Sequence, residues 1–451
     1  MSRQGSERTR VLFLTRGWPS RGGTEVWLDT LVGQLRAHGV EVEVGVAEGA
    51  RFNDPDELFA ASRFVRSGHV LDGCSGWREG RRYRVRRLLE RLRPAVVAPL
   101  RLQDGLHVAS REKARHGFRI VYPLHEYRAG YFQDLVDYGS WIDRVVVCDE
   151  LSRRAVIEVA GLEESQVTLI TQGVAPGSGR RTAEPGPLRL GYVGRLEESQ
   201  KRVSDLVAVC RALDRRGVKF LLRIVGAGPE ERTLKENLRP WVEKGSVEML
   251  PWQSPAILAA EFYPAIDVLV LTSSRETGPI VAWEAMAAGA LLVTARYRGL
   301  EAAGFLVSGE NCLIYEIGDC DDAAAQIEMV ARDAQLRRRL AAAGRERVER
   351  ERSLEGVARS WLTLFERLRT EPPRQGTRPL PAGEPNGSRL GRMGLPVPVV
   401  EGVRRFVGRR FLHASPGEEW PFHSVPGQNL NERLQSELNR LDTRGTWRRG
   451  K

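Results

Sequence analysis

The feature that most constrains the fold is a short apolar run followed by a glycine-containing loop and an alanine-rich segment. Residues 266–271 (IDVLVL) are almost all branched and apolar, as in a strand that is buried on both faces of a parallel sheet. From Ile280 the sequence holds good helix formers, and Gly289 is a suitable residue to end the helix. The pattern predicts a strand, a loop and a helix of an α/β domain. Such domains bind ligands at the carboxyl ends of their strands.

Two carboxylates lie in this segment. We expect Glu276 on the loop after the strand and Glu284 about two turns into the helix. The first amides of the helix favour an anion, and Gly278 and Ile280 can donate hydrogen bonds where Pro279 cannot. Two isolated glutamates would usually be solvated or capping residues. Their place after a buried strand favours a binding role, because a carboxylate can accept hydrogen bonds from two adjacent hydroxyls.

This stretch, SSRETGPIVAWEAMAAG, resembles the signature of the retaining glycosyltransferases of family 4. Members of that family have the GT-B fold, an α/β architecture of two Rossmann-like domains that face a central cleft. The resemblance implies that Glu276 contacts the sugar of a nucleotide-sugar donor and that Glu284 holds its ribose hydroxyls. It also places Thr277, Gly278 and Ile280 in the donor site.

A second motif follows a strand predicted over residues 188–193. Gly194 and Arg195 come directly after the strand, and Lys201 precedes a helical segment. Two exposed cations are ordinarily solvated, but in this order they resemble the diphosphate-binding pair of the family. Arginine can bind a phosphate through two parallel hydrogen bonds, whereas lysine acts as a point charge. We expect both side chains to stabilise the departing diphosphate, an electrostatic contribution to catalysis.

The N-terminal half contains weaker signals. Gly22 and Gly23 separate a strand at residues 11–15 from a helix, so backbone amides there could approach a phosphate closely. A pair of glycines before a helix is otherwise a simple turn. The position resembles the phosphate-contacting glycine loop of the family. His125 follows a strand at residues 118–122 and resembles the family's loop histidine near the donor sugar; the alternative is a structural histidine.

The chain has 451 residues, which favours two or three domains. A Gly-, Pro- and Arg-rich segment divides two α/β halves, and a second polar segment follows the last long helix. We predict a flexible N-terminus (1–9), an acceptor domain (10–176), a linker (177–187), a donor domain (188–368), a disordered Pro/Gly/Arg-rich linker (369–400) and a basic tail with short helices (401–451).

The net charge of +11 is unevenly distributed, and residues 371–451 hold 14 Lys and Arg against 8 Asp and Glu. Such an excess suits an anionic membrane surface, an acidic polysaccharide or nucleic acid. Nucleic acid is the weakest of the three, because no nucleic-acid-binding module is recognisable. Residues 403–411 have the pattern of a basic amphipathic helix, which could lie on a membrane or dock on the core.

Residues 78–93 hold eight Arg against two Glu and an apolar stripe at helical spacing. A packed helix with a solvated basic face is the simpler interpretation. The other hypothesis is that Arg81, Arg82 and Arg86 contact an anionic acceptor or a lipid headgroup.

No apolar run approaches 18 residues, the N-terminus is polar, and the five cysteines form no CxxC pair. These features predict a cytoplasmic protein with reduced thiols, either free or peripheral at the inner face of a membrane.

The sequence predicts a retaining glycosyltransferase that moves a sugar from a nucleotide diphosphate donor to an acceptor hydroxyl. The acceptor could be a glycan, a lipid-linked molecule or a small molecule, so polysaccharide and glycoconjugate biosynthesis both fit. By the resemblance, no metal and no other cofactor are needed. Two alternatives remain: a phosphorylase or epimerase of the same fold, and a non-catalytic transferase-like binding subunit.

Overall fold

The computed structural model describes residues 9–17, 22–73, 75–177, 186–300, 304–381, 389–421, 423 and 428–443. The chain divides into two compact units. The first unit comprises residues 1–148, 152–170 and 358–444, and the second comprises residues 149–151, 171–357 and 445–451. Most of the predicted linker 177–187 and of the predicted flexible segment 1–9 lies outside the described residues.

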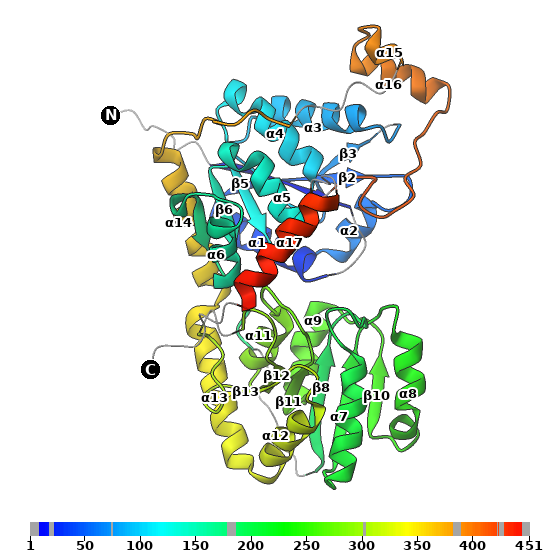
Figure 1. The fold of residues 1–451 in the computed structure, drawn as a ribbon, viewed down its shortest axis with the longest axis vertical. Helices are drawn as coiled ribbons and strands as arrows, with labels where there is room; N and C mark the ends of the chain where they lie inside the picture. Colours follow the sequence, from blue (N-terminus) through cyan, green and yellow to red (C-terminus); the bar gives the residue numbers. More distant parts are fainter. Residues whose placement is uncertain are drawn as a thin grey trace. The chain divides into compact units, whose positions relative to one another are not determined.

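The first unit is built on a seven-stranded sheet with the order β3-β2-β1-β4-β5-β6-β7, and all of its strand pairs are parallel (Figure 1). Its strands are β1 (Arg10–Arg16), β2 (Glu41–Glu48), β3 (His69–Asp72), β4 (Val96–Pro99), β5 (Arg119–Leu124), β6 (Arg144–Val147) and β7 (Val167–Leu169). The strand order reverses direction between β1 and β4, as in a doubly wound Rossmann-like domain.

The second unit has a parallel six-stranded sheet with the order β10-β9-β8-β11-β12-β13. Its strands are β8 (Leu188–Val193), β9 (Phe220–Val225), β10 (Val247–Leu250), β11 (Val268–Leu271), β12 (Leu291–Ala295) and β13 (Leu313–Tyr315). Here the order reverses between β8 and β11. The chain therefore contains two Rossmann-like sheets, as the sequence predicts.

Helices follow the strands along the chain in both units. Those up to the first unit's last strand are α1 (Gly23–Ala37), α2 (Pro55–Ala61), α3 (Arg78–Leu92), α4 (Gln103–His116), α5 (Ala129–Tyr138), η1 (Gly139–Trp141), α6 (Glu150–Glu158) and η2 (Glu164–Gln166). Those of the second sheet are α7 (Ser204–Arg215), α8 (Glu231–Glu243), α9 (Pro255–Ile257), η3 (Leu258–Phe262), α10 (Tyr263–Ala265), α11 (Ile280–Ala287), α12 (Cys320–Arg332) and α13 (Ala334–Glu351). The last are α14 (Leu354–Thr370), α15 (Arg389–Arg392), α16 (Val397–Phe406) and α17 (Gln428–Thr443).

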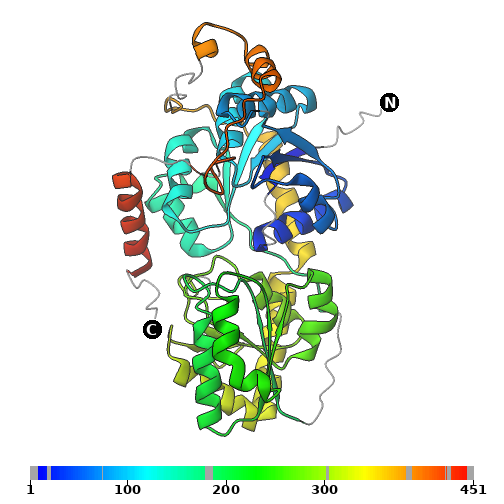
Figure 2. The ribbon, with the colours of Figure 1, turned by 90° about the vertical axis from the view of Figure 1, so that its right-hand side faces the viewer.

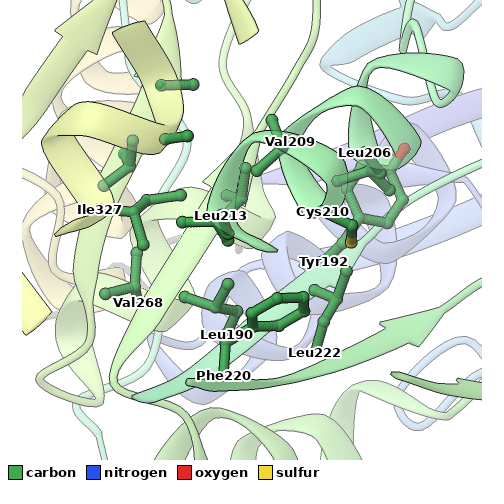
Figure 3. Packing of buried hydrophobic residues seen from close by; sticks show 14 of the residues in the cluster. Leu190, Tyr192, Leu206, Val209, Cys210, Leu213, Phe220, Leu222, Val268 and Ile327 are labelled. Atoms are coloured by element: carbon green, nitrogen blue, oxygen red, sulfur yellow. The ribbon is translucent and has the colours of Figure 1, made fainter. Parts of the chain in front are cut away.

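The central strands β11 and β12 of the second sheet are buried on both faces, which explains their continuous apolar sequences. Along β11, Val268 and Val270 belong to the core under α7 and α12, whereas Leu269 and Leu271 belong to the core under α11. Figure 3 shows the first of these cores, where side chains of α7 pack on those of β8 and β9. Figure 2 shows helices on both sides of this sheet. Alternation along a strand thus supplies apolar groups to two layers.

The segment after α14 differs from the sequence prediction. The sequence predicts disorder over 369–400, but the structure describes α15, the start of α16 and an ordered stretch up to residue 381. In that stretch Arg374 forms an ion pair with Glu163 at 2.6 Å, and its amide donates to Asp143. Further on, α17 packs against α5. These segments belong to the first unit. Among the described residues, no helix is long and apolar enough to cross a bilayer.

Candidate functional site

The second sheet brings the two main motifs together at one edge. Strands β8 and β11 are neighbours and parallel. The loop after β8 carries Arg195 and Lys201, and the loop after β11 carries Glu276. Since the carboxyl ends of parallel strands meet at the same edge, both loops lie at the point where the strand order reverses. Ligands of α/β domains bind at such points.

Hydrogen bonds hold these two loops together. The amide of Ser274 donates to the carbonyl oxygen of Gln200 at 2.8 Å, and the carboxamide of Gln200 donates to the carbonyl oxygen of Arg275 at 3.1 Å. The hydroxyl of Thr272 donates to the carbonyl oxygen of Lys201 at 2.6 Å. These contacts fix the backbone on which Lys201 and Glu276 stand, so the site is preorganised.

Lys201 and Glu276 form an ion pair. The Lys201 Nζ lies 2.5 Å from Glu276 Oε1, and the two side chains are only 14% and 8% exposed. Burial and the nearby Glu276 carboxylate both raise the pKa of Tyr192, whose hydroxyl donates to the carbonyl oxygen of Arg195 at 3.1 Å. An ammonium group held against a carboxylate at a strand end can bind a phosphate, while the carboxylate can accept hydroxyl hydrogen bonds.

Arg195 is the more exposed cation of the site. Its side chain is 60% exposed and lies 3.7 Å from Glu197, and its guanidinium donates to Gln200 at 2.9 Å. The glycines of the turn after β9 allow the loop that carries Arg195 to pack closely. A Cβ atom on Gly226 would lie 2.0 Å from the carbonyl oxygen of Gly194, so a larger residue there would displace the loop.

Glu284 stands on α11 and has a partner that the sequence does not reveal. The hydroxyl of Tyr263 donates to Glu284 Oε2 at 2.7 Å. Burial raises the pKa of the Glu284 carboxyl to about 7, and the hydrogen bond from Tyr263 acts in the opposite direction. The carboxyl therefore titrates close to neutral pH in this structure. Tyr263 lies on α10 before β11, and no local pattern links it to Glu284.

Gln172 is a further residue of the site, to which the sequence analysis assigns no chemistry. Gly278 has a φ of 145°, in a region that favours glycine. A Cβ atom at this position would lie 2.2 Å from Gln172 Oε1. Gln172 is 5% exposed, and among the described residues its Oε1 accepts no hydrogen bond. The carboxamide thus packs directly against the glycine that joins Thr277 to α11.

The first unit holds the other sequence candidates. Gly22 is the N-cap of α1, and its amide donates to Glu25 at 3.2 Å. Gly23 is the first residue of that helix.

His125 lies against the Trp27 ring, with 4.2 Å between ring centroids. Burial and the nearby Arg101 lower the pKa of His125 to about 3, so the imidazole is neutral at physiological pH.

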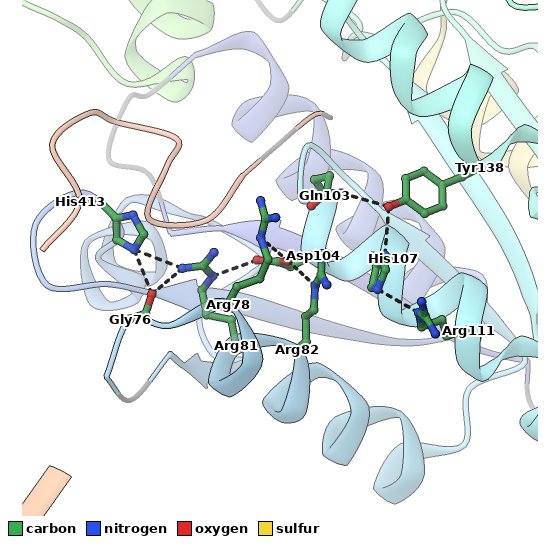
Figure 4. A network of polar contacts seen from close by, with 10 residues as sticks. All are labelled: Gly76, Arg78, Arg81, Arg82, Gln103, Asp104, His107, Arg111, Tyr138 and His413. Carbon is green, nitrogen blue, oxygen red and sulfur yellow. Dashed lines mark hydrogen bonds and ion pairs between the residues drawn. The ribbon is translucent and has the colours of Figure 1, made fainter. Parts of the chain in front are cut away.

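Arg81 and Arg82 of α3 pair with a buried carboxylate. Their guanidinium groups pair with Asp104 at 2.9 and 2.8 Å, and the Arg81 side chain is 3% exposed (Figure 4). Burial raises the pKa of Asp104, but the surrounding arginines outweigh this effect and hold its pKa below the usual value. Arg86 pairs instead with Glu90 and Glu112. The ion pairs of Arg81 and Arg82 agree with the interpretation of a packed helix, and an acceptor or lipid contact through this helix stays a prediction.

Comparison with known families covers both units. Residues 21–177 match the family described as Glycosyltransferase Family 4, and residues 180–347 match the family described as Glycosyl transferases group 1. The chain belongs to the family 4 glycosyltransferases. The second matched region contains the loops with Arg195, Lys201 and Glu276.

Two bacterial relatives have related sequences. The chain is 33% identical over 144 residues to the lipopolysaccharide core biosynthesis glycosyltransferase LpsE of Rhizobium meliloti, which covers 32% of this chain and 41% of LpsE. It is 25% identical over 360 residues to LpsD of the same organism, which covers 77% of this chain and 96% of LpsD. The chain thus spans less than half of the length of LpsE.

The fold also has solved counterparts. The structure of HepE from Anabaena in complex with UDP superimposes with a TM-score of 0.66 and 18% sequence identity, which covers 80% of this chain and 100% of HepE. This likeness and the two Rossmann-like sheets confirm the predicted GT-B fold of this family member.

Two arginines in the first unit have no place in the sequence motifs. Arg16 is the last residue of β1 and Arg101 follows β4, at the point where the first sheet reverses its order. Arg101 pairs with Glu126 at 3.1 Å. Burial and Arg101 lower the pKa of Arg16 to about 10. Both residues lie at the carboxyl ends of parallel strands, and this position in the sequence is a signal that could have identified them.

Proposed function

We propose that this family member transfers a sugar from a nucleoside diphosphate donor to an acceptor hydroxyl with retention of the anomeric configuration. The observation that carries the proposal is the buried Lys201–Glu276 ion pair between β8 and β11. A lysine for a diphosphate and a carboxylate for sugar hydroxyls then lie side by side at the ligand-binding edge of the sheet. The UDP bound by HepE supports a uridine diphosphate sugar as the donor.

In the proposed mechanism the bond between the anomeric carbon and the diphosphate oxygen breaks while the acceptor oxygen bonds to the same face of that carbon. The acceptor proton goes to the departing phosphate oxygen. Lys201, Arg195 and the first amides of α11 would stabilise the charge that develops on the diphosphate. Lys201 would share its interaction between the phosphate and Glu276, which leaves Glu276 oxygens for the sugar hydroxyls.

Glu284 is proposed to hold the ribose. Glu284 is the fifth residue of α11, so it lies little more than about one turn from the loop with Glu276, which suits a second contact to the same donor. A carboxylate that accepts two hydroxyl hydrogen bonds favours the ionised form, so donor binding should lower the raised pKa of Glu284. The roles that the family resemblance implies for Gly22, Gly23, Gly194 and His125 remain predictions.

The names of LpsE and LpsD support a polysaccharide or glycolipid acceptor for this chain. We propose that the first unit binds it, and that the protein acts at the inner face of a membrane, where a lipid-linked acceptor would be presented.

The experiment uses the full chain with UDP-, GDP-, ADP- and TDP-sugars and follows release of the nucleoside diphosphate. Glu276→Gln tests the site. Glu248→Gln is the control, because Glu248 also forms an ion pair with a cation on the same sheet (Arg223, 3.0 Å) but at an exposed position. We expect release from one donor, at least tenfold slower in Glu276→Gln and unchanged in Glu248→Gln. Release that requires inorganic phosphate would assign a phosphorylase. The absence of both turnover and nucleotide binding would assign a binding subunit.

A further inference from the structure

Helix α16 docks on the first unit through a charged face. Glu401 and Arg404 are both buried. The Glu401 carboxylate accepts hydrogen bonds from the amide and the hydroxyl of Ser75 at 3.1 and 2.8 Å. Arg404 pairs with Glu401 at 2.5 Å and with Glu79 at 3.3 Å, and its guanidinium lies 4.4 Å from the Trp77 ring centroid. The side of α16 that faces the protein is thus mainly ionic.

The opposite face is apolar and exposed. Val399, Val403 and Phe406 follow one another at helical spacing on α16, and Phe406 is 94% exposed. Eight of the fifteen exposed large hydrophobic side chains in the described part of the protein lie between residues 393 and 412. We name these eight the apolar patch: Met393, Leu395, Val399, Val403, Phe406, Val407, Phe411 and Leu412. Figures 1 and 2 show α15 and α16 (orange) at the outer edge of the first unit, beyond α3.

This orientation is opposite to that of an ordinary surface helix, which turns its apolar side inward. Burial of an ion pair is a weak source of stability, and exposed apolar area is unfavourable in water. Such a concentration of exposed large apolar side chains in one short segment indicates an interaction surface. The arrangement is therefore suited to a partner that covers the apolar side.

A second anchor holds the segment after α16 in place. The carboxylate of Glu419 accepts hydrogen bonds from the amides of Arg51, Phe52 and Asn53 at 3.0, 2.9 and 3.1 Å. The Trp420 side chain is fully buried, and its indole donates to the carbonyl oxygen of Glu48 at 2.7 Å. The chain is thus fixed on both sides of the exposed residues 405–412, so the apolar patch is presented by an ordered framework.

Cations accompany the apolar patch. Arg405, Arg409 and Arg410 are exposed, and Arg405 shares Asp72 with Arg84 of α3. Apolar side chains beside several arginines are the composition of a helix that lies in a membrane interface, where anionic lipids attract the cations. A second copy of the chain fits less well, because a two-fold interface would place the same arginines opposite one another.

We propose that the apolar patch and Arg405, Arg409 and Arg410 form a docking surface for an anionic lipid bilayer. The apolar side chains enter the headgroup region, and the arginines contact lipid phosphates. The proposal does not depend on sugar transfer, because vesicle binding requires neither donor nor acceptor. Failure of vesicle binding would leave the proposed sugar transfer intact, and failure of sugar transfer would leave the proposed docking surface intact.

The test is flotation of the full chain with vesicles of phosphatidylcholine alone or with about one third phosphatidylglycerol. We expect binding to the anionic vesicles that weakens with added salt. The triple variant Val403→Ser, Phe406→Ser, Val407→Ser should lose at least tenfold in binding. The triple variant Arg405→Glu, Arg409→Glu, Arg410→Glu should lose at least about a hundredfold, because the loss of each basic residue near an anionic surface is worth about fivefold and the new carboxylates add repulsion.

Two control variants alter side chains of the same kind on the second unit. Ile257→Ser, Ile317→Ser, Met329→Ser removes exposed apolar groups, and Arg232→Glu, Arg239→Glu, Arg350→Glu reverses exposed charges. Both should bind vesicles like the unaltered protein. The proposal is overturned if the unaltered protein does not float with anionic vesicles, or if the patch variants bind as well as the controls. A dimer in sedimentation velocity that only the patch variants dissociate would assign the surface to a second copy instead.

Discussion

Replacement of Lys201 by Met should distinguish the contribution of the ion pair to stability from its contribution to the rate of sugar transfer. The variant leaves Glu276, whose side chain is 8% exposed, without its partner at 2.5 Å. An unsatisfied buried group costs about 1–3 kcal/mol of unfolding free energy. Loss of the cation should also remove about 3 kcal/mol of transition-state stabilisation, which corresponds to about a hundredfold in rate. Glu276→Gln should give a similar loss in rate with a smaller loss in stability.

The double variant Lys201→Met, Glu276→Gln provides the decisive comparison. With neither charge left in the site, most of the stability should return, with a coupling free energy of about 1–3 kcal/mol between the two positions. The rate should not return. Urea denaturation gives the stability, and release of the nucleoside diphosphate gives the rate. A double variant that regains both, or a Lys201→Met protein that is destabilised but fully active, would mean that the pair is only structural and would refute the reasoning.

Three further predictions concern single positions. The pKa of Glu284 is raised to about 7, so the ligand-free protein should lose stability as the pH rises from about 4.5 through 7. Thermal melts should show this fall of the melting temperature with pH in the unaltered protein and not in Glu284→Gln. Gly278→Ala should lower stability by about 1–3 kcal/mol and weaken nucleotide binding, since the new methyl group meets Gln172. Gly309 also has a positive φ but has open space around it, so Gly309→Ala should leave nucleotide binding unchanged. Equal nucleotide affinities for the two glycine variants would contradict this explanation. Since the pKa of His125 is lowered to about 3, His125→Gln should not alter the shape of the pH–rate profile between pH 6 and 8; a lost inflection in that range would show that this histidine titrates there.

The sequence predicts most of the frame because its signals are local. Residues 268–271, which are all buried and enter two cores alternately, come from a continuous apolar run, which is easily recognised. The loops after β8 and β11 follow such runs directly, so the sequence predicts Lys201 and Glu276 each after a strand, whereas their ion pair depends on the pairing of β8 with β11. The short strands β3, β10 and β13 are not among the strands that the sequence predicts.

The missed features depend on contacts between distant segments. Tyr263 reaches Glu284 from another helix, and Gln172 reaches Gly278 from a different part of the chain. The C-terminal tail docks through polar residues such as Glu419. Sequence analysis expects a docking helix to use an apolar stripe, so it does not predict this contact. For the same reason, the composition of residues 369–400 indicates disorder although parts of it are ordered by ion pairs such as that of Arg374 with Glu163.

The most direct test of the proposed site is calorimetric titration of the full chain with UDP, and with GDP, ADP and TDP if UDP does not bind. The account predicts that one nucleoside diphosphate binds, that Lys201→Met weakens its binding at least tenfold, and that Glu248→Gln has no effect. Equal affinity in the unaltered protein and in Lys201→Met, or the absence of binding by all four nucleotides, would contradict the claim that the edge between β8 and β11 holds the diphosphate of the donor.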